Sequence, residues 1–302
     1  DYSFAYGKGR ITLPLDEKNV LAVLHGNDYP AVGDIGAVLV ESLSRPIDAE
    51  PLPRQLRPED RVALVVSDMS RFWMRQDLVI PHLVAYLERE CGIPDGAITI
   101  VVANGTHTGG DERELRTLVT DAVYDRIRVE NHDCQAGDLV YMGETAHGTP
   151  VWLNHTVAAA DFVICLGACT HHIMAGYGGG RKSILPGVSG LATIRHNHAF
   201  SLDALRLRSN PAIGNGVLRG NPLHEDMCEA AAMLPRLFMV NLVMNAQMQL
   251  AAIFSGHWLH AWERACRLTD EIYHVAVPCR ADAVVASCGG FPKDISLYQG
   301  TK

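Results

Sequence analysis

Short apolar, β-branched segments alternate with helical segments along this chain, and that alternation most constrains its fold. Residues 76–91 space their apolar side chains as a helix does and stop before Gly92. Asp111 and Glu112 open another helix with the negative charge that a helix N-terminus favours. The segments that we expect to be strands are residues 61–67, 97–103, 126–130, 161–166 and 281–287. This order predicts an α/β fold, with a mainly parallel or mixed sheet and flanking helices.

Polar clusters follow four of these expected strands at the point where each strand ends. They are Ser67-Asp68, residues 104–107, residues 131–133 and residues 167–172. In open α/β sheets, ligands bind at the carboxyl ends of the strands, where the loops converge. We therefore expect these four clusters to form a site together.

Composition excludes several classes of partner. The net charge of −8 argues against nucleic acid or an anionic membrane as the main partner, since both bind basic surfaces. The apolar stretch at residues 234–254 is interrupted by polar side chains, so we do not expect it to span a membrane. The eight cysteines are scattered without CxxC pairs, as is typical of reduced thiols. We expect a cytoplasmic protein.

A glycine-rich loop at residues 176–180 is followed by Arg181 and Lys182 and is bracketed by histidines. Glycines let backbone N–H groups approach an anion closely, and the two cations add charge beside them. A flexible surface turn with two solvated cations is the simpler interpretation. Fourteen histidines in the chain, with His171 and His172 before the loop and His196 and His198 after it, favour acid/base or metal chemistry.

Two common nucleotide loops do not match this segment. Both the phosphate loop GxxxxGK[ST] and the dinucleotide pattern GxGxxG require glycine where Arg181 stands. Nine residues also separate Leu166 from Gly176, and Pro186 would break a helix that began at the loop. A nucleotide-dependent transferase therefore stays only a minor alternative.

Five motifs, in order along the chain, resemble the nickel-pincer lactate racemase family of 2-hydroxyacid racemases and epimerases. The family pattern runs SDxTRP, GTH, PHxxAGYSGGxKxIxPG, a TI…H segment and GGxPxDxxLYQxxK. Here the corresponding residues are 67–71, 105–107, 172–187, 193–198 and 289–302. The resemblance covers nearly the whole chain.

The resemblance implies a nickel-pincer nucleotide, a pyridinium mononucleotide whose two sulfur groups hold nickel. Lys182 would be tethered to it as a thioamide, and His198 would be the protein's nickel ligand, although His196 is barely separated from it by sequence. His107 and His172 match the acid/base pair. The remaining implied cofactor-binding residues are Asp68, Gly176, Tyr177, Gly178, Gly179, Gly180 and Arg181, and the substrate-binding residues are Arg71, Tyr298, Gln299 and Lys302.

The chemistry explains why such a site needs these residue types. The Cα–H of a 2-hydroxyacid is not acidic, whereas its departure as hydride gives a flat keto acid that can be reduced again from either face. Side chains are poor hydride acceptors, so a cofactor must take that role. Two imidazoles, one on each side, suit removal of the hydroxyl proton from either enantiomer. A guanidinium such as Arg71 suits a substrate carboxylate, although an ion pair with Asp68 is an alternative for it.

Departures from the family pattern gather around the substrate. Ser70 and Phe72 replace Thr and Pro, His171 replaces Pro, Gly178 replaces Ser, and Thr108 stands where Arg is usual. Trp73 and Met74 beside Arg71 favour a 2-hydroxyacid larger than lactate.

We expect residues 1–275 to be an N-terminal cofactor-binding and catalytic domain, and residues 276–302 to begin a C-terminal domain that continues in the family. Without that lid the isolated chain would bind the cofactor without turnover. The predicted function is a nickel-dependent isomerase, a 2-hydroxyacid racemase or epimerase, with cofactor-biosynthesis enzymes as partners. A non-catalytic relative that only holds the cofactor is the main alternative.

Overall fold

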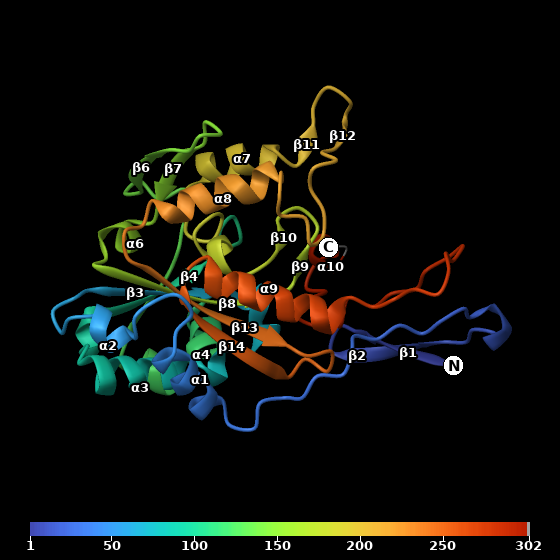
Figure 1. The fold of residues 1–302 in the computed structure, drawn as a ribbon, viewed down its shortest axis with the longest axis horizontal. Helices are drawn as coiled ribbons and strands as arrows, with labels where there is room; N and C mark the ends of the chain where they lie inside the picture. Colours follow the sequence, from blue (N-terminus) through green and yellow to red (C-terminus); the bar gives the residue numbers. More distant parts are fainter. Residues whose placement is uncertain (301–302) are drawn as a thin grey trace.

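The computed structural model describes residues 1–300, with residues 298 and 299 described by their backbone alone. Its centre is a six-stranded mixed sheet in the order β14-β13-β8-β3-β4-β5 (Figure 1). All neighbouring pairs are parallel except β13 with β14, which is antiparallel. The strands are β3 (Val62–Ser67), β4 (Ile98–Ala103), β5 (Arg128–Asn131), β8 (Phe162–Cys169), β13 (Leu237–Met244) and β14 (Leu250–His257). The predicted α/β fold with a mixed sheet is confirmed.

Helices flank both faces of this sheet. The α-helices are α1 (Ile35–Ser44), α2 (Leu52–Gln55), α3 (Ile80–Cys91), α4 (Glu112–Val119), α5 (Asp121–Tyr124), α6 (His155–Ala159), α7 (Leu191–Ala199), α8 (Pro222–Ala232), α9 (His260–Tyr273) and α10 (Leu297–Gly300). The 3-10 helices are η1 (Glu17–Asn19), η2 (Met69–Met74), η3 (Gln76–Leu78), η4 (Asp95–Ala97) and η5 (Gly180–Ser183). Short pairs of strands complete the fold: β1 (Tyr2–Tyr6) with β2 (Gly9–Leu13), β6 (Val140–Glu144) with β7 (Pro150–Leu153), β9 (His171–His172) with β10 (Gly176–Tyr177), and β11 (Leu202–Asp203) with β12 (Arg208–Ser209).

The two faces of the sheet bury different sets of side chains, because successive residues of a strand point to opposite sides. In β3, Leu64 and Val66 pack in a core with α1 and α3, whereas Ala63 and Val65 pack in a second core with α6 and α8. A third cluster lies between α9 and the ends of β8 and β13. Burial on both faces explains why these strands read as continuous apolar runs rather than alternating ones.

One predicted strand is wrong. Residues 281–287 form no strand in the described part of the chain, and Val284 is 83% exposed. An apolar run becomes a strand only where another strand pairs with it, and none of the described residues does so here. The strand predicted at 126–130 begins two residues later, and that predicted at 161–166 runs on to Cys169.

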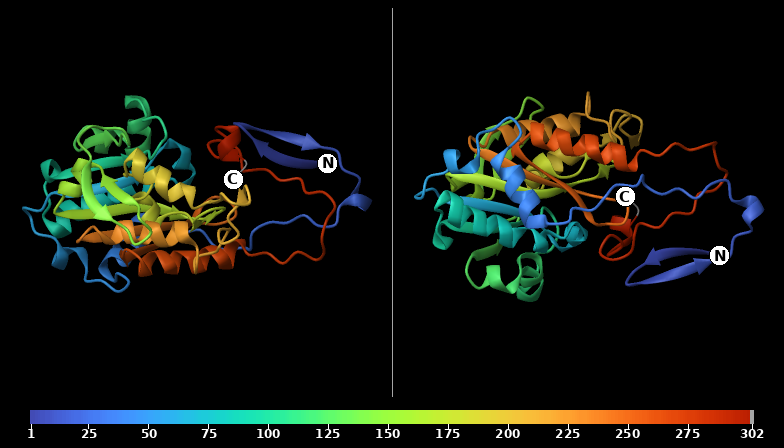
Figure 2. Two further views of the ribbon diagram at one scale, coloured as in Figure 1. Left: turned by 90° about the horizontal axis from the view of Figure 1, so that it is seen from above. Right: turned by 60° about the horizontal axis from the view of Figure 1, so that its bottom comes forward.

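The first and last segments of the chain lie side by side, away from the central sheet (Figure 2). The Phe291 amide donates to the Gly7 carbonyl at 2.8 Å, and the Gly7 amide donates to the Asp294 carboxylate at 2.5 Å. The Ser287 hydroxyl donates to the Ala5 carbonyl. These contacts show that the β1–β2 hairpin packs against residues 287–294. The domain boundary near residue 276 stays a prediction.

Within residues 1–300, no helix is both long and apolar enough to cross a membrane.

Candidate active site

A cavity of about 660 Å³ opens at the carboxyl ends of β3, β4 and β8. Its wall is completed by α7 and by residues of the 288–300 segment. Eight of the predicted site residues line it: Asp68, Arg71, His107, His172, Gly178, Gly179, Lys182 and His198. Parallel strands place their carboxyl ends at one edge, which explains how motifs far apart in sequence meet there.

Four predicted site residues lie outside the cavity wall, and three cannot be placed. Gly176, Tyr177, Gly180 and Arg181 do not line the cavity. The side chains of Tyr298 and Gln299, and the whole of Lys302, lie outside the described residues.

The turn after β3 holds Asp68 and Arg71 at the mouth of the cavity. One carboxylate oxygen of Asp68 accepts from the Ser70 hydroxyl at 2.7 Å. The Arg71 guanidinium in turn donates to the Ser70 hydroxyl oxygen at 3.1 Å. Ser70, one of the departures from the family pattern, therefore connects the two charged side chains.

His107 is oriented by the second carboxylate oxygen of Asp68, which lies 2.5 Å from the imidazole Nδ1. Its loop turns back sharply: the His107 amide donates to the Asn104 carbonyl, and Gly105 has a positive φ of 55°. An ionised carboxylate can only accept a hydrogen bond, so Nδ1 of His107 carries the hydrogen. A neutral ring with its hydrogen on Nδ1 carries its lone pair on Nε2.

His172 is held in the opposite tautomer. Its Nδ1 accepts hydrogen bonds from the backbone amides of Met174 at 3.2 Å and Ala175 at 3.1 Å. A neutral His172 ring must therefore carry its hydrogen on Nε2. The neighbouring His171 also lines the cavity, and its Nε2 pairs with Asp270 at 2.8 Å.

Two glycines let the loop backbone pack closely against strand β8 and helix α9. Gly179 has a φ of 67°, and a Cβ there would meet the Ala168 carbonyl oxygen at 2.8 Å. Gly180 has a φ of 52°, and a Cβ there would meet the Trp262 ring at 2.5 Å. The chain continues through the short 3-10 helix η5 and not through an α-helix. A nucleotide phosphate loop leads directly into an α-helix, so this geometry differs from one.

Arg181 differs from the expectation of a cation placed beside a bound anion. It is only 1% exposed, and its guanidinium carbon lies 3.9 Å from the centre of the Trp262 ring. It donates to the carbonyls of Ala175 and Tyr177 and to Nδ1 of His224. Burial lowers the pKa of Arg181 to about 10. The side chain therefore supports the glycine loop on the side away from the cavity, through the backbone of Ala175 and Tyr177.

Helix α7 carries both of the histidines that sequence barely separated. His198 lines the cavity, whereas His196 places its Nδ1 2.8 Å from the Thr149 hydroxyl. Residues two positions apart on a helix point to different sides, so one helix cannot aim both rings at the same point. Of the two histidines, His198 is therefore the one that the cavity brings together with Lys182.

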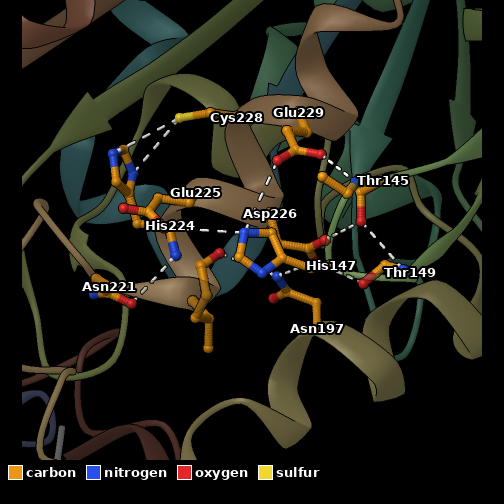
Figure 3. Close-up of polar contacts among 12 residues, drawn as sticks. Thr145, His147, Thr149, Asn197, Asn221, His224, Glu225, Asp226, Cys228 and Glu229 are labelled. Atoms are coloured by element: carbon orange, nitrogen blue, oxygen red, sulfur yellow. Dashed lines mark hydrogen bonds and ion pairs between the residues drawn. The ribbon is translucent and has the colours of Figure 1, made fainter.

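A buried carboxylate fixes the orientation of α7 (Figure 3). Asp226 on α8 is fully buried and accepts from the Asn197 amide at 2.8 Å and from the Thr149 hydroxyl at 2.9 Å. The Thr145 hydroxyl donates to its other oxygen. Because Asn197 directly precedes His198, this network sets the direction in which His198 points.

The polar cluster after β5 supports the site without lining it. Buried His132 donates from Nε2 to the Ser189 carbonyl at 2.9 Å, and burial lowers its pKa. Asn131 accepts from the Asn104 side chain at 3.0 Å. We expected all four polar strand ends to form the site, and this is wrong for residues 131–133, which do not line the cavity. The reason is that β5 is the edge strand farthest from β8, around which the cavity lies.

Lys293 is a cavity residue that the sequence did not reveal. It lines the wall together with Cys288 and Ser296. The family pattern leaves its position, between Pro292 and Asp294, unspecified. Only the cavity itself identifies it.

The fold and the cavity define an α/β protein with a candidate ligand site at the carboxyl ends of its parallel strands. Comparison with known proteins identifies the family. Residues 6–209 match the lactate racemase N-terminal domain family, so the chain belongs to that family. It is 27% identical over 301 residues to a lactate racemase of Thermoanaerobacterium thermosaccharolyticum, an alignment that covers 98% of this chain and 68% of the relative. It is 28% identical over 301 residues to a lactate racemase of Lactiplantibacillus plantarum, covering 98% of this chain and 69% of that relative.

A solved structure shares the fold. The lactate racemase apoprotein from Thermoanaerobacterium thermosaccharolyticum matches with a TM-score of 0.82 at 24% sequence identity, over 99% of this chain and 69% of that one.

Proposed function

We propose that the protein is a 2-hydroxyacid racemase or epimerase that works by reversible hydride transfer to a nickel-pincer nucleotide tethered through Lys182. The observation that carries the proposal is that His107, His172, Lys182 and His198 come from four separate segments and line one cavity. The relatives named as lactate racemases support an isomerase that acts on lactate or a related acid.

The residues present fit such a cofactor. Among residues 1–300, His, Cys, Asp and Glu form no cluster of three or more that could hold a metal by themselves. A nickel held mainly by the sulfur groups of its own nucleotide would need few donors from the protein, and the imidazole of His198 would suit as one of them. Lys182 and the backbone of Gly178 and Gly179 lie on the same wall. Arg181 supports this wall by shaping the loop, together with Gly176, Tyr177 and Gly180.

When bound, this cofactor would supply the acceptor for the hydrogen on the substrate's α-carbon. The protein must still hold the carboxylate and move the hydroxyl proton. Arg71 would bind the carboxylate through its guanidinium fork, which keeps the substrate in place while its centre inverts. Tyr298, Gln299 and Lys302 remain proposed substrate residues on the pattern alone.

The two histidines enter the reaction in different states. The Nε2 lone pair of His107 would take the hydroxyl proton of the enantiomer that faces it, and Asp68 would stabilise the imidazolium that forms. His172 presents Nε2–H and would first donate a hydrogen bond to the substrate oxygen. To act as a base, its ring must release the two amides that hold Nδ1. General acid/base catalysis of this kind contributes about 10²–10⁴ in rate.

We further propose a cytoplasmic setting with cofactor-biosynthesis enzymes as partners. All eight cysteines are free thiols in the structure, as expected in a reducing compartment.

Mass spectrometry of the full-length protein, co-produced with the cofactor-making enzymes, tests the proposal. We expect an added mass on the wild type and on a Lys8→Ala control, which removes an exposed lysine outside the cavity. Lys182→Ala should lose that addition, because the tether is gone. A wild-type protein without added mass would overturn the proposal, and added mass without inversion of any 2-hydroxyacid would favour a non-catalytic carrier.

A further inference from the structure

Lys293 is a cation of the cavity to which the proposed mechanism gives no role. Its side chain is partly buried, with Nζ 4.9 Å from the centre of the Trp73 ring and 3.4 Å from the sulfur of Met248. Within the described part of the chain, no Asp or Glu forms an ion pair with it. A buried ammonium among apolar groups is costly unless an anion accompanies it, and burial accordingly lowers the pKa of Lys293.

The charge of the cavity is unbalanced toward the positive. Arg71, Lys182 and Lys293 are the cations among its described lining residues, and Asp68 is the one carboxylate. Asp68 is already engaged by His107 and Ser70. Under the proposed function, Lys182 loses its charge in the covalent tether and Arg71 takes the carboxylate beside the reacting carbon. Lys293 is left to attract a further anionic group.

The position of Lys293 places that anionic group on the substrate side. The ring that Lys293 covers, Trp73, belongs to the same short helix η2 as Arg71. Lys293 therefore contacts the wall that follows β3 and carries Arg71, whereas the glycine loop and Lys182 follow β8. The apolar surroundings of Trp73 and Met248 would strengthen an ion pair formed there, because they exclude water.

Building on the proposed function, we propose that the substrate is a 2-hydroxyacid with a second carboxylate, which Lys293 binds while Arg71 holds the first. A substrate that ends in a methyl group would leave Lys293 at the cavity wall without an anion. Sites built to bind a charged or polar group discriminate strongly against analogues that lack it. This preference sharpens the expectation of an acid larger than lactate.

The cofactor's phosphate is the other anion that Lys293 could meet. The two sources differ in what a substitution would change. Loss of a phosphate contact would lower the fraction of protein that carries the cofactor mass. Loss of a substrate contact would leave that fraction unchanged and would alter the choice between acids.

The test compares 2-hydroxysuccinate with lactate, using the cofactor-loaded full-length protein and following inversion by polarimetry. We expect the wild type to favour 2-hydroxysuccinate in kcat/KM. Lys293→Met keeps the length of the side chain but removes its charge, and should lower that preference by about 100-fold. Lys293→Arg should retain much of the preference. Lys8→Met is the matched control, because it removes a lysine that also lies over an aromatic ring, Phe291, but outside the cavity.

Calorimetry of 2-hydroxysuccinate with cofactor-free protein gives a readout independent of turnover, and Lys293→Met should weaken that binding about tenfold or more. Equal kcat/KM ratios in wild type and Lys293→Met would overturn the inference and leave the racemase proposal standing. A loss of cofactor mass in Lys293→Met with an unchanged ratio would assign Lys293 to the phosphate. Failure of the wild type to invert either acid would overturn both proposals.

Discussion

At the scale of single residues, two histidines of the same type are prepared differently by their neighbours. A carboxylate faces Nδ1 of His107, whereas two backbone amides face Nδ1 of His172. An acceptor at Nδ1 makes the ring a base at Nε2, and a donor at Nδ1 makes it a hydrogen-bond donor at Nε2. The pair is therefore asymmetric before any substrate binds.

Asp68→Asn tests this asymmetry. An asparagine keeps the shape of the side chain but removes the charge that fixes the His107 tautomer and would stabilise its imidazolium. We expect kcat for 2-hydroxyacid inversion to fall about 100-fold with a small change in KM. Steady-state kinetics of the loaded protein measure this, with Asp28→Asn as control, since Asp28 is exposed outside the cavity wall. A large rise in KM at constant kcat would instead make Asp68 a substrate-binding residue.

At the scale of elements, the glycine loop owes its shape to what lies behind it. Arg181 stacks on Trp262 from α9, and its Nε donates to Nδ1 of His224 from α8. His224 can accept this bond only while it is neutral. Burial, followed by the nearby Arg181 charge, lowers the pKa of His224 to about 3.

This arrangement predicts how stability depends on pH. An unfolded His224 binds a proton near pH 6.5, whereas the folded one does so only near pH 3. The unfolded state therefore binds more protons than the folded state between these pH values. The stability that the neutral, buried His224 contributes is fully present above pH 6.5 and is lost as the pH falls toward 3. Arg181 and Cys228 are the titratable groups that face the ring.

Urea unfolding at pH 7 and pH 5 measures the effect. The wild type should lose more unfolding free energy between these pH values than His224→Asn, which retains an acceptor but cannot titrate. His25→Asn removes an exposed histidine and should behave as the wild type does. The same loss in His224→Asn as in the wild type would refute this explanation.

At the scale of the whole molecule, both ends of the chain contribute to one corner of the structure. The 288–300 segment supplies Cys288, Lys293, Ser296 and Gly300 to the cavity wall, and the β1–β2 hairpin packs against it. Asp294 joins them, because its carboxylate accepts from the Gly7 amide. The hairpin therefore supports a wall of the site although it is far from the site in sequence.

Hydrogen–deuterium exchange of Asp294→Ala tests this support. A hydrogen bond to a charged group is worth about 1.5–3 kcal/mol, so we expect exchange at Gly7 and its neighbours to accelerate about tenfold or more. Exchange in the central strands should not change. Asp282→Ala, which removes an exposed carboxylate shortly before this segment, is the control. Unchanged exchange in the hairpin would show that the Asp294 contact does not hold the two segments together.

How far the sequence could predict the structure differs between the sheet and the site. Four strands of the central sheet, β3, β4, β5 and β8, were predictable because their apolar runs are local, and only their ends moved. The strands β13 and β14 were not predicted, although they lie in or beside the apolar stretch at residues 234–254. The run at 281–287 misled because strand formation depends on a partner that the run itself does not specify. Within the site, the resemblance to the family pointed to His107, His172, Lys182 and His198, and all four line the cavity.

Sequence by itself determined the α/β fold, the family and the segments that carry the site, because apolar periodicity and ordered motifs are written along the chain. The tertiary structure alone decided which way each side chain faces. It turned Arg181 behind the loop, separated His198 from His196, gave the two histidines opposite tautomers and brought Lys293 into the cavity. The physical reason is that burial and hydrogen-bond partners come from segments distant in sequence, and these contacts exist only once the chain has packed.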